Sequence, residues 1–81
     1  MVLLKNIKKT DDYIEADYYP EATDAAGHIR IGNDKNVISV SYSEEDNSVL
    51  RSYFVHARKR LRELLDVESN SVPKETVVMW Y

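Results

Sequence analysis

The sequence predicts an α+β fold, a two-layer sandwich in which one long helix packs on one face of a mainly antiparallel sheet. Several short segments alternate apolar with polar residues, which is typical of strands that bury one face. One longer segment, residues 49–65, repeats its apolar residues every three or four positions, as an amphipathic helix does. The predicted order of elements is β-β-β-β-α-β within a single small domain, residues 1–81.

The first two strands are predicted in residues 3–8 and 13–19. The first alternates only weakly and is expected at an edge of the sheet, with one face formed by Leu3, Lys5 and Ile7. The second alternates well and ends at Pro20, since proline lacks the N–H group that continues a ladder. Its face away from the helix is expected to carry Tyr13, Glu15, Asp17 and Tyr19.

A tight β-hairpin is predicted next, with strands in residues 28–33 and 37–43. The residues between them, Gly32 to Asn36, are types that tolerate positive φ and therefore favour a turn. Alternation then gives the set of strand residues expected to face the helix: Ile14, Ala16, Tyr18, Ile29, Ile31, Ile38, Val40 and Tyr42.

The helix is predicted from Val49 to Leu65. Ser43 to Asp46 nearly matches a capping box just upstream, with Asn47 and Ser48 as alternative caps. The apolar stripe is Leu50, Tyr53, Phe54, Ala57, Leu61, Leu64 and Leu65. A last strand is predicted at residues 76–81, and the sequence leaves open whether it pairs with the first strand or lies between others.

Composition excludes several kinds of chemistry. The chain has no cysteine, so disulfides, thiolate nucleophiles, iron–sulfur clusters and thiolate zinc sites are ruled out, and a reducing cytoplasm is the expected compartment. No stretch approaches the roughly 18 apolar residues of a membrane span, and the apolar run near the N-terminus is too short for a secretory signal. The net charge of −3 has the wrong sign for a general nucleic-acid coat protein.

The sequence contains no grouping that is typical of a catalytic or cofactor site. His28 and His56 have no carboxylate at metal-ligand spacing, and the serines at 39, 41 and 43 lack a glycine-flanked elbow. Neither Gly27 nor Gly32 opens the helix, as a phosphate loop would require. We therefore expect no enzyme, no catalytic residue, no metal, no cofactor and no small-molecule substrate, and no motif is specific to a characterised family.

The first candidate site is the back of the sheet, the face turned away from the helix. Tyrosines next to carboxylates suit a protein interface, and the partner is another protein or a second copy of the chain. The residues predicted to form this interface are Tyr13, Glu15, Asp17 and Tyr19. The alternative for the same residues is cross-strand pairing with His28 and Arg30 on the next strand.

The second candidate site is the basic face of the helix, formed by Arg51, Arg58, Lys59 and Arg62 and also holding Val55. A nucleic-acid-associated accessory role is the alternative function that this face suggests. The basic face also has a purely structural explanation. In that explanation Arg62 pairs with Asp66 and Lys59 with Glu63, and the arginines complement the helix dipole. The leading hypothesis is a non-enzymatic protein-interaction or regulatory module that does not bind membranes.

Overall fold

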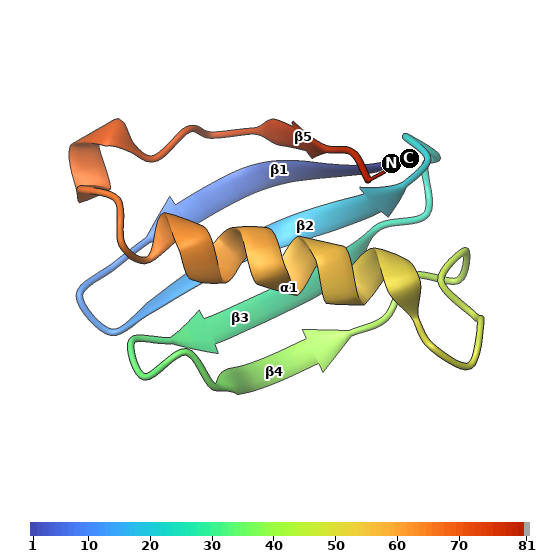
Figure 1. The fold of residues 1–81 in the computed structure, drawn as a ribbon, viewed down its shortest axis with the longest axis horizontal. Coiled ribbons are helices and arrows are strands. Elements are labelled where there is room, and N and C mark those ends of the chain that lie inside the picture. The colour runs from blue at the N-terminus through green and yellow to red at the C-terminus, as the bar shows by residue number, and fades with distance from the viewer. Residues whose placement is uncertain (81) are drawn as a thin grey trace.

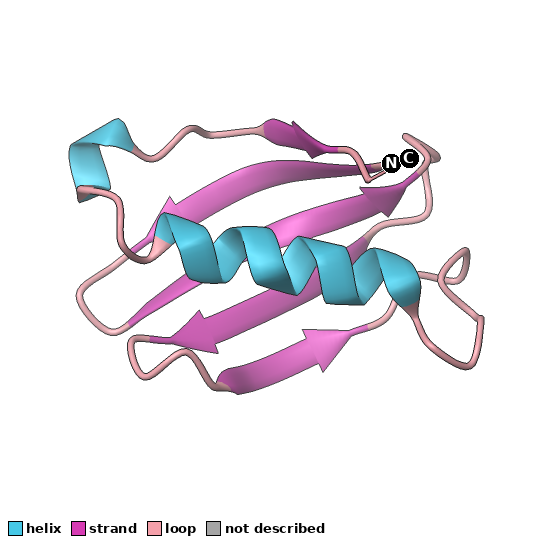
Figure 2. Ribbon diagram, viewed as in Figure 1, coloured by secondary structure: helices cyan, strands magenta, loops and turns pink. Residues whose placement is uncertain are grey.

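The computed structural model describes residues 1–80 and confirms the predicted class and order of elements. A five-stranded antiparallel sheet forms one layer, and one long helix lies across one of its faces (Figure 1). The elements are β1 (Val2–Lys9), β2 (Tyr13–Pro20), β3 (Gly27–Gly32), β4 (Val37–Ser41), α1 (Ser52–Leu64), the short 3₁₀ helix η1 (Ser69–Ser71) and β5 (Thr76–Val78). Figure 2 shows the two layers by secondary structure. The last predicted strand is therefore shorter than expected, and Tyr81 lies outside the described residues.

The strand order is β4-β3-β2-β1-β5, and every neighbouring pair is antiparallel. The last strand, whose position the sequence left open, pairs with β1 through Leu3 and Val77 and their neighbours. The prediction of an edge position for the first strand is therefore wrong, because β5 covers the side of β1 that β2 leaves free. The two edges of the sheet are β4 and β5.

The core lies between α1 and the sheet. Its buried apolar residues are Val2, Leu4, Ile7, Ile14, Ala16, Tyr18, Ile29, Ile31, Phe54, Ala57, Leu61 and Leu64. Five of the eight sheet residues predicted to face the helix are thus fully buried: Ile14, Ala16, Tyr18, Ile29 and Ile31. The helix packs mainly on β1, β2, β3 and β5, and β4 lies to one side of it (Figure 1).

Two β-bulges shift the alternation that the sequence predicted. In β4 the partner of Ile31 is Val37 and the partner of Ile29 is Val40, so Ile38 is an extra residue and is 58% exposed. Its predicted position in the core is wrong. Val40 packs against the core as predicted, and the ring of Tyr42, 43% exposed, lies edge-on 5.2 Å from that of Phe54.

The bulge in β1 is at Asn6, which has a φ of 54°. Because Asn tolerates this left-handed conformation, the chain can insert one extra residue between the pairs of Lys5 and Lys8. The buried side chains before the bulge are Val2 and Leu4, and the one after it is Ile7. The prediction that Leu3, Lys5 and Ile7 share one face is therefore wrong.

The helix begins at Ser52, three residues later than predicted. Val49 is 100% exposed and Leu50 is 80% exposed, so Leu50 does not belong to the buried stripe. The predicted capping box is also absent: Arg51, at the N-cap position, has a φ of 44° and its side chain makes no capping hydrogen bond. The helix start is instead capped by Asp46, whose Oδ2 accepts a 3.0 Å hydrogen bond from the N–H of Phe54.

Asp46 is also the centre of a buried polar cluster. The hydroxyl of Tyr18 donates to Asp46 Oδ2 over 3.0 Å and accepts from the N–H of Ser43 over 3.0 Å. Burial raises the pKa of the Tyr18 hydroxyl, which keeps this donor protonated. Gly27 makes room for the ring, since a Cβ there would lie 2.1 Å from Tyr18 Cε1.

The C-terminal end of α1 is held by a lysine from the sheet. Lys9 Nζ donates to the carbonyl of Leu65 over 2.8 Å and to that of Val67 over 2.5 Å. A cation at this position satisfies carbonyls that have no partner within the helix and complements the helix dipole. Asp46 and Lys9 therefore fix α1 at both ends, and they set the position of its basic face relative to β4.

Candidate binding surfaces

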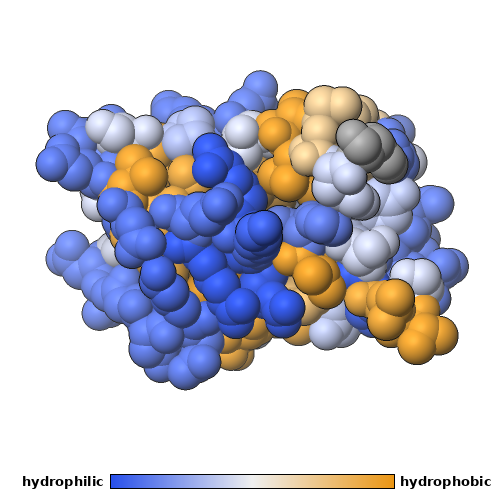
Figure 3. Space-filling model, viewed as in Figure 1, coloured by the Kyte–Doolittle hydropathy of each residue, from blue (hydrophilic) through white to orange (hydrophobic). Residues whose placement is uncertain are grey.

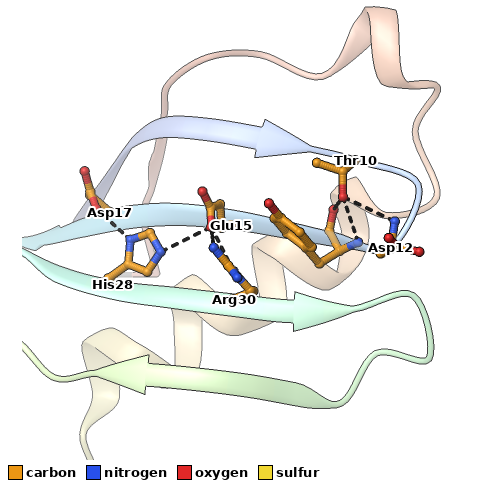
Figure 4. A network of polar contacts seen from close by, with 7 residues as sticks. Thr10, Asp12, Glu15, Asp17, His28 and Arg30 are labelled. Carbon is orange, nitrogen blue, oxygen red and sulfur yellow. Dashed lines mark hydrogen bonds and ion pairs between the residues drawn. The ribbon is translucent and has the colours of Figure 1, made fainter.

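The back of the sheet carries an ion-paired network that links β2 to β3 (Figure 4). Arg30 donates to Glu15 Oε2 from Nη2 over 2.6 Å and from Nε over 2.9 Å. His28 Nδ1 lies 2.8 Å from Asp17 Oδ1, and its Nε2 lies 3.5 Å from Glu15 Oε2. The register explains the contacts, because Glu15 is opposite Arg30 and Asp17 is opposite His28.

These partners keep both carboxylates ionised. The hydrogen bonds from Arg30 hold the pKa of Glu15 below its usual value, and they outweigh the opposing effect of burial. Burial alone would raise the pKa of Asp17, but the hydrogen bonds from His28 and Asn6 lower it overall. The contacts that the cross-strand alternative predicted are therefore present, and Arg30 compensates the charge of Glu15 within the chain.

The two tyrosines of the same face also have partners. The guanidinium of Arg30 lies 4.3 Å from the ring centroid of Tyr13, and Lys5 Nζ lies 5.5 Å from that of Tyr19. The four residues predicted as a protein interface, Tyr13, Glu15, Asp17 and Tyr19, thus come together on the sheet back. Each one is partly buried and engaged within the chain, and their role as an interface stays a prediction.

The predicted basic face of α1 divides into two parts. Arg51 stabilises the start of the helix: Nη1 donates to the Asp46 carbonyl over 2.6 Å, and the guanidinium lies 3.9 Å from the ring centroid of Tyr42. Arg58, Lys59 and Arg62 instead line a groove of about 450 Å³. Figure 3 shows that the outer surface around α1 is mainly hydrophilic, with a hydrophobic protrusion at the loop before it, where Val49 and Leu50 are exposed.

The groove lies between α1 and the turn that joins β3 to β4, because Lys35 from that turn also lines it. Arg62 Nε donates to the Lys35 carbonyl over 2.9 Å. The predicted helix ion pairs are wrong: Asp66 pairs with Lys35 over 3.0 Å, and Glu63 pairs with Arg60 over 3.5 Å. Sequence reasoning missed Lys35, since no local pattern indicates that this turn meets the end of the helix.

Arg58 has an unusual environment within the groove. Its guanidinium lies 5.2 Å from the ring centroid of Phe54, and its Nε is buried with no hydrogen-bond partner among residues 1–80. Val55, predicted on the same face, also lines the groove. The groove therefore combines cationic side chains with a small apolar surface.

The turn that lines this groove through Lys35 leads into β4, which is an edge strand of the sheet. Within residues 1–80, β4 pairs with β3 alone, so the backbone groups on its other side are available. Its sequence, VISVS, contains no charged residue and no proline, two features that commonly prevent further pairing of edge strands, although it carries a third, the bulge at Ile38. Ile38 is exposed on this strand. The other edge strand, β5, has only three residues.

His56 lies in a neighbouring hollow, which shares Lys59 and Glu63 with this groove. Its ring stacks on that of Trp80, with 4.0 Å between centroids, and lines a hollow of about 240 Å³ together with Met79 and Arg60. Among residues 1–80 no group of three or more His, Asp or Glu side chains is placed to hold a metal ion. Within the same residues, no helix has the length and apolar character that crossing a membrane requires.

Comparison with known proteins gives no match: no family model, no curated protein and no solved structure is significantly similar to this chain.

Proposed function

We propose that this chain is a small, non-enzymatic, cytoplasmic protein-interaction module that receives an extended segment of a partner protein along the free edge of β4. The observation that carries the proposal is the uncharged, proline-free edge strand with Ile38 exposed on it. A strand added there would gain backbone hydrogen bonds along β4, which is the usual source of affinity in strand addition. The cysteine-free sequence suits the reducing cytoplasm.

The edge of β4 has better support than the sheet back as the docking surface. On the sheet back, binding would compete with contacts that the chain already makes, since Glu15 and Asp17 are paired with Arg30 and His28. Separating or burying such pairs costs free energy that a partner must return. The backbone groups on the outer side of β4 have no such competing contact within the sheet.

The homodimer expected from the sequence is a second form of the same proposal, with a copy of the chain as partner and the sheet back as interface. One exposed apolar residue favours the sheet back as this interface. Val77 is 50% exposed and pairs with Leu3, and Leu3 in turn pairs with Tyr19 on the next strand. Sedimentation equilibrium separates the two forms. A dimer that Tyr19→Ala dissociates supports the sheet back, whereas a monomer supports docking of another protein at β4.

The test of β4 is affinity capture from the native cytosol with three forms of the chain: unchanged, Ile38→Glu and Val77→Glu. Both substituted residues are exposed on edge strands, so each variant should retain its stability to within about 0.5 kcal/mol. A charge on the β4 edge should prevent strand addition. We expect the unchanged chain and Val77→Glu to retain the same protein and Ile38→Glu to lose it.

Two results would contradict the proposal. The first is a strictly monomeric chain that retains no protein at all. The second is a retained protein whose binding Ile38→Glu leaves unchanged, which would move the interface away from β4.

A further inference from the structure

The groove between α1 and the turn that joins β3 to β4 has an excess of positive charge. Four basic side chains line it, Lys35, Arg58, Lys59 and Arg62, against the two acidic ones, Glu63 and Asp66. Both acidic side chains already have a cationic partner, Arg60 for Glu63 and Lys35 for Asp66. The whole chain has a net charge of −3, so this positive region differs in sign from the rest of the molecule.

The spacing of the cations matches that of side chains on one face of a strand. Arg58 and Arg62 are one helical turn apart on α1, which separates them by about 6 Å along the axis. Alternate residues of an extended segment are about 6.6 to 6.8 Å apart. Figure 1 shows that α1 runs lengthwise over the sheet and that β3 lies between it and β4. Arg62 already reaches the turn at the start of β4, where its Nε donates to the Lys35 carbonyl over 2.9 Å, so the groove adjoins the end of β4 where a paired segment would begin or finish.

From this arrangement we infer the chemical class of the partner: the segment that docks on β4 is an extended acidic peptide, with Asp or Glu at alternate positions facing Arg58 and Arg62. The inference rests on the proposed function, since the peptide is held by the β4 edge and selected by the groove. Ile38, exposed on β4, gives the non-acidic side chains of the segment an apolar contact.

Two other occupants fit the charges less well. A second copy of the chain, paired through β4, would bring its own Arg58, Lys59 and Arg62 toward those of the first, and like charges oppose such pairing. A nucleic acid would use the cations but would gain nothing from the uncharged edge of β4 or from exposed Ile38. The net negative charge of the chain also opposes a polyanion at long range.

The test is selection of a displayed library of random 12-residue peptides on the immobilised full chain, followed by fluorescence anisotropy with synthetic copies of the selected peptides. The variant is Arg58→Glu combined with Arg62→Glu. The control combines Lys8→Glu with Lys74→Glu, which changes the net charge equally at exposed residues that do not line the groove. We expect acidic residues at alternate positions, and a loss of affinity of about tenfold or more in the variant but not in the control.

The outcomes separate this inference from the proposed function. Selected peptides without acidic excess, whose binding survives the double charge reversal but not Ile38→Glu, would overturn acidic selectivity and leave docking at β4 standing. Failure to enrich any peptide over the empty support would overturn the inference, while the capture experiment would decide the proposed function separately. Tighter binding of single-stranded or duplex DNA, weakened by added salt and by Arg58→Glu with Arg62→Glu, would overturn it in favour of a nucleic-acid role.

Discussion

Asp46 shows how a single buried residue links the helix, the sheet and the loop between them. Its Oδ2 accepts from the Tyr18 hydroxyl and from the N–H of Phe54, and its carbonyl accepts from Arg51. The near capping box in the sequence, Ser43 to Asp46, correctly indicated the segment that caps the helix, but not how the cap forms. The capping carboxylate acts from eight residues before Phe54, and only the folded loop brings the two together.

Replacing this carboxylate should strongly destabilise the fold. We expect Asp46→Ala to lower the free energy of unfolding by about 2 to 4 kcal/mol, because it removes the helix cap and leaves two buried donors without an acceptor. Glu45→Ala, at the exposed neighbouring position, should change stability by about 0.5 kcal/mol or less. Urea denaturation measures both. Equal effects of the two substitutions would show that the buried cluster contributes little.

At the scale of elements, alternation and helical periodicity were enough to predict five strands and a helix, but not the two bulges. Val37 and Ile38 are both apolar, so the pattern gave no reason to place the extra residue of β4 at Ile38. In β1 the only signal was Asn6, a residue type that tolerates positive φ. Bulges depend on how neighbouring strands pair, and pairing was not predictable from one strand at a time.

The paired strands β2 and β3 should give stability a pH dependence of known sign. The pKa of Glu15 is below its usual value of 4.5 in the folded state, so folding favours the ionised form. Its contribution is complete above the pKa of the unfolded chain and is lost as the pH falls through the lower, folded value. Glu15→Gln should therefore be less stable than the unchanged chain at pH 7 by about 0.5 to 1 kcal/mol.

We expect this difference to shrink as the pH is lowered from about 5 to about 3, where the unchanged chain also loses the charge on Glu15. Urea denaturation of the two proteins across this range measures it. Other carboxylates also titrate in this range; hydrogen bonds from Asn36, for example, lower the pKa of Asp34. Their effect is the same in both proteins, so it cancels when the two free energies of unfolding are subtracted. A constant difference across the range would mean that the ion pair with Arg30 does not contribute.

At the scale of the whole molecule, the sequence predicted the residues of each candidate surface better than it predicted the surfaces themselves. The alternation of residues 13–19 correctly placed Tyr13, Glu15, Asp17 and Tyr19 together. The helical spacing grouped Arg58, Lys59 and Arg62, but the groove also needs Lys35, which lies far away in the chain. The free edge of β4 could not be predicted, because it depends on β5 pairing with β1 at the other side of the sheet.

The central claim, that an acidic segment adds to the edge of β4 as a strand, is tested most directly by amide hydrogen exchange. The ¹⁵N-labelled chain would be measured by NMR with and without a synthetic peptide of alternating Glu and Thr, and with a Lys and Thr peptide as control. We expect the acidic peptide to slow exchange of the outward N–H groups of Val37–Ser41 and to leave those of Thr76–Val78 unchanged. Slowed exchange confined to β5, or equal protection of β4 by the basic peptide, would contradict it.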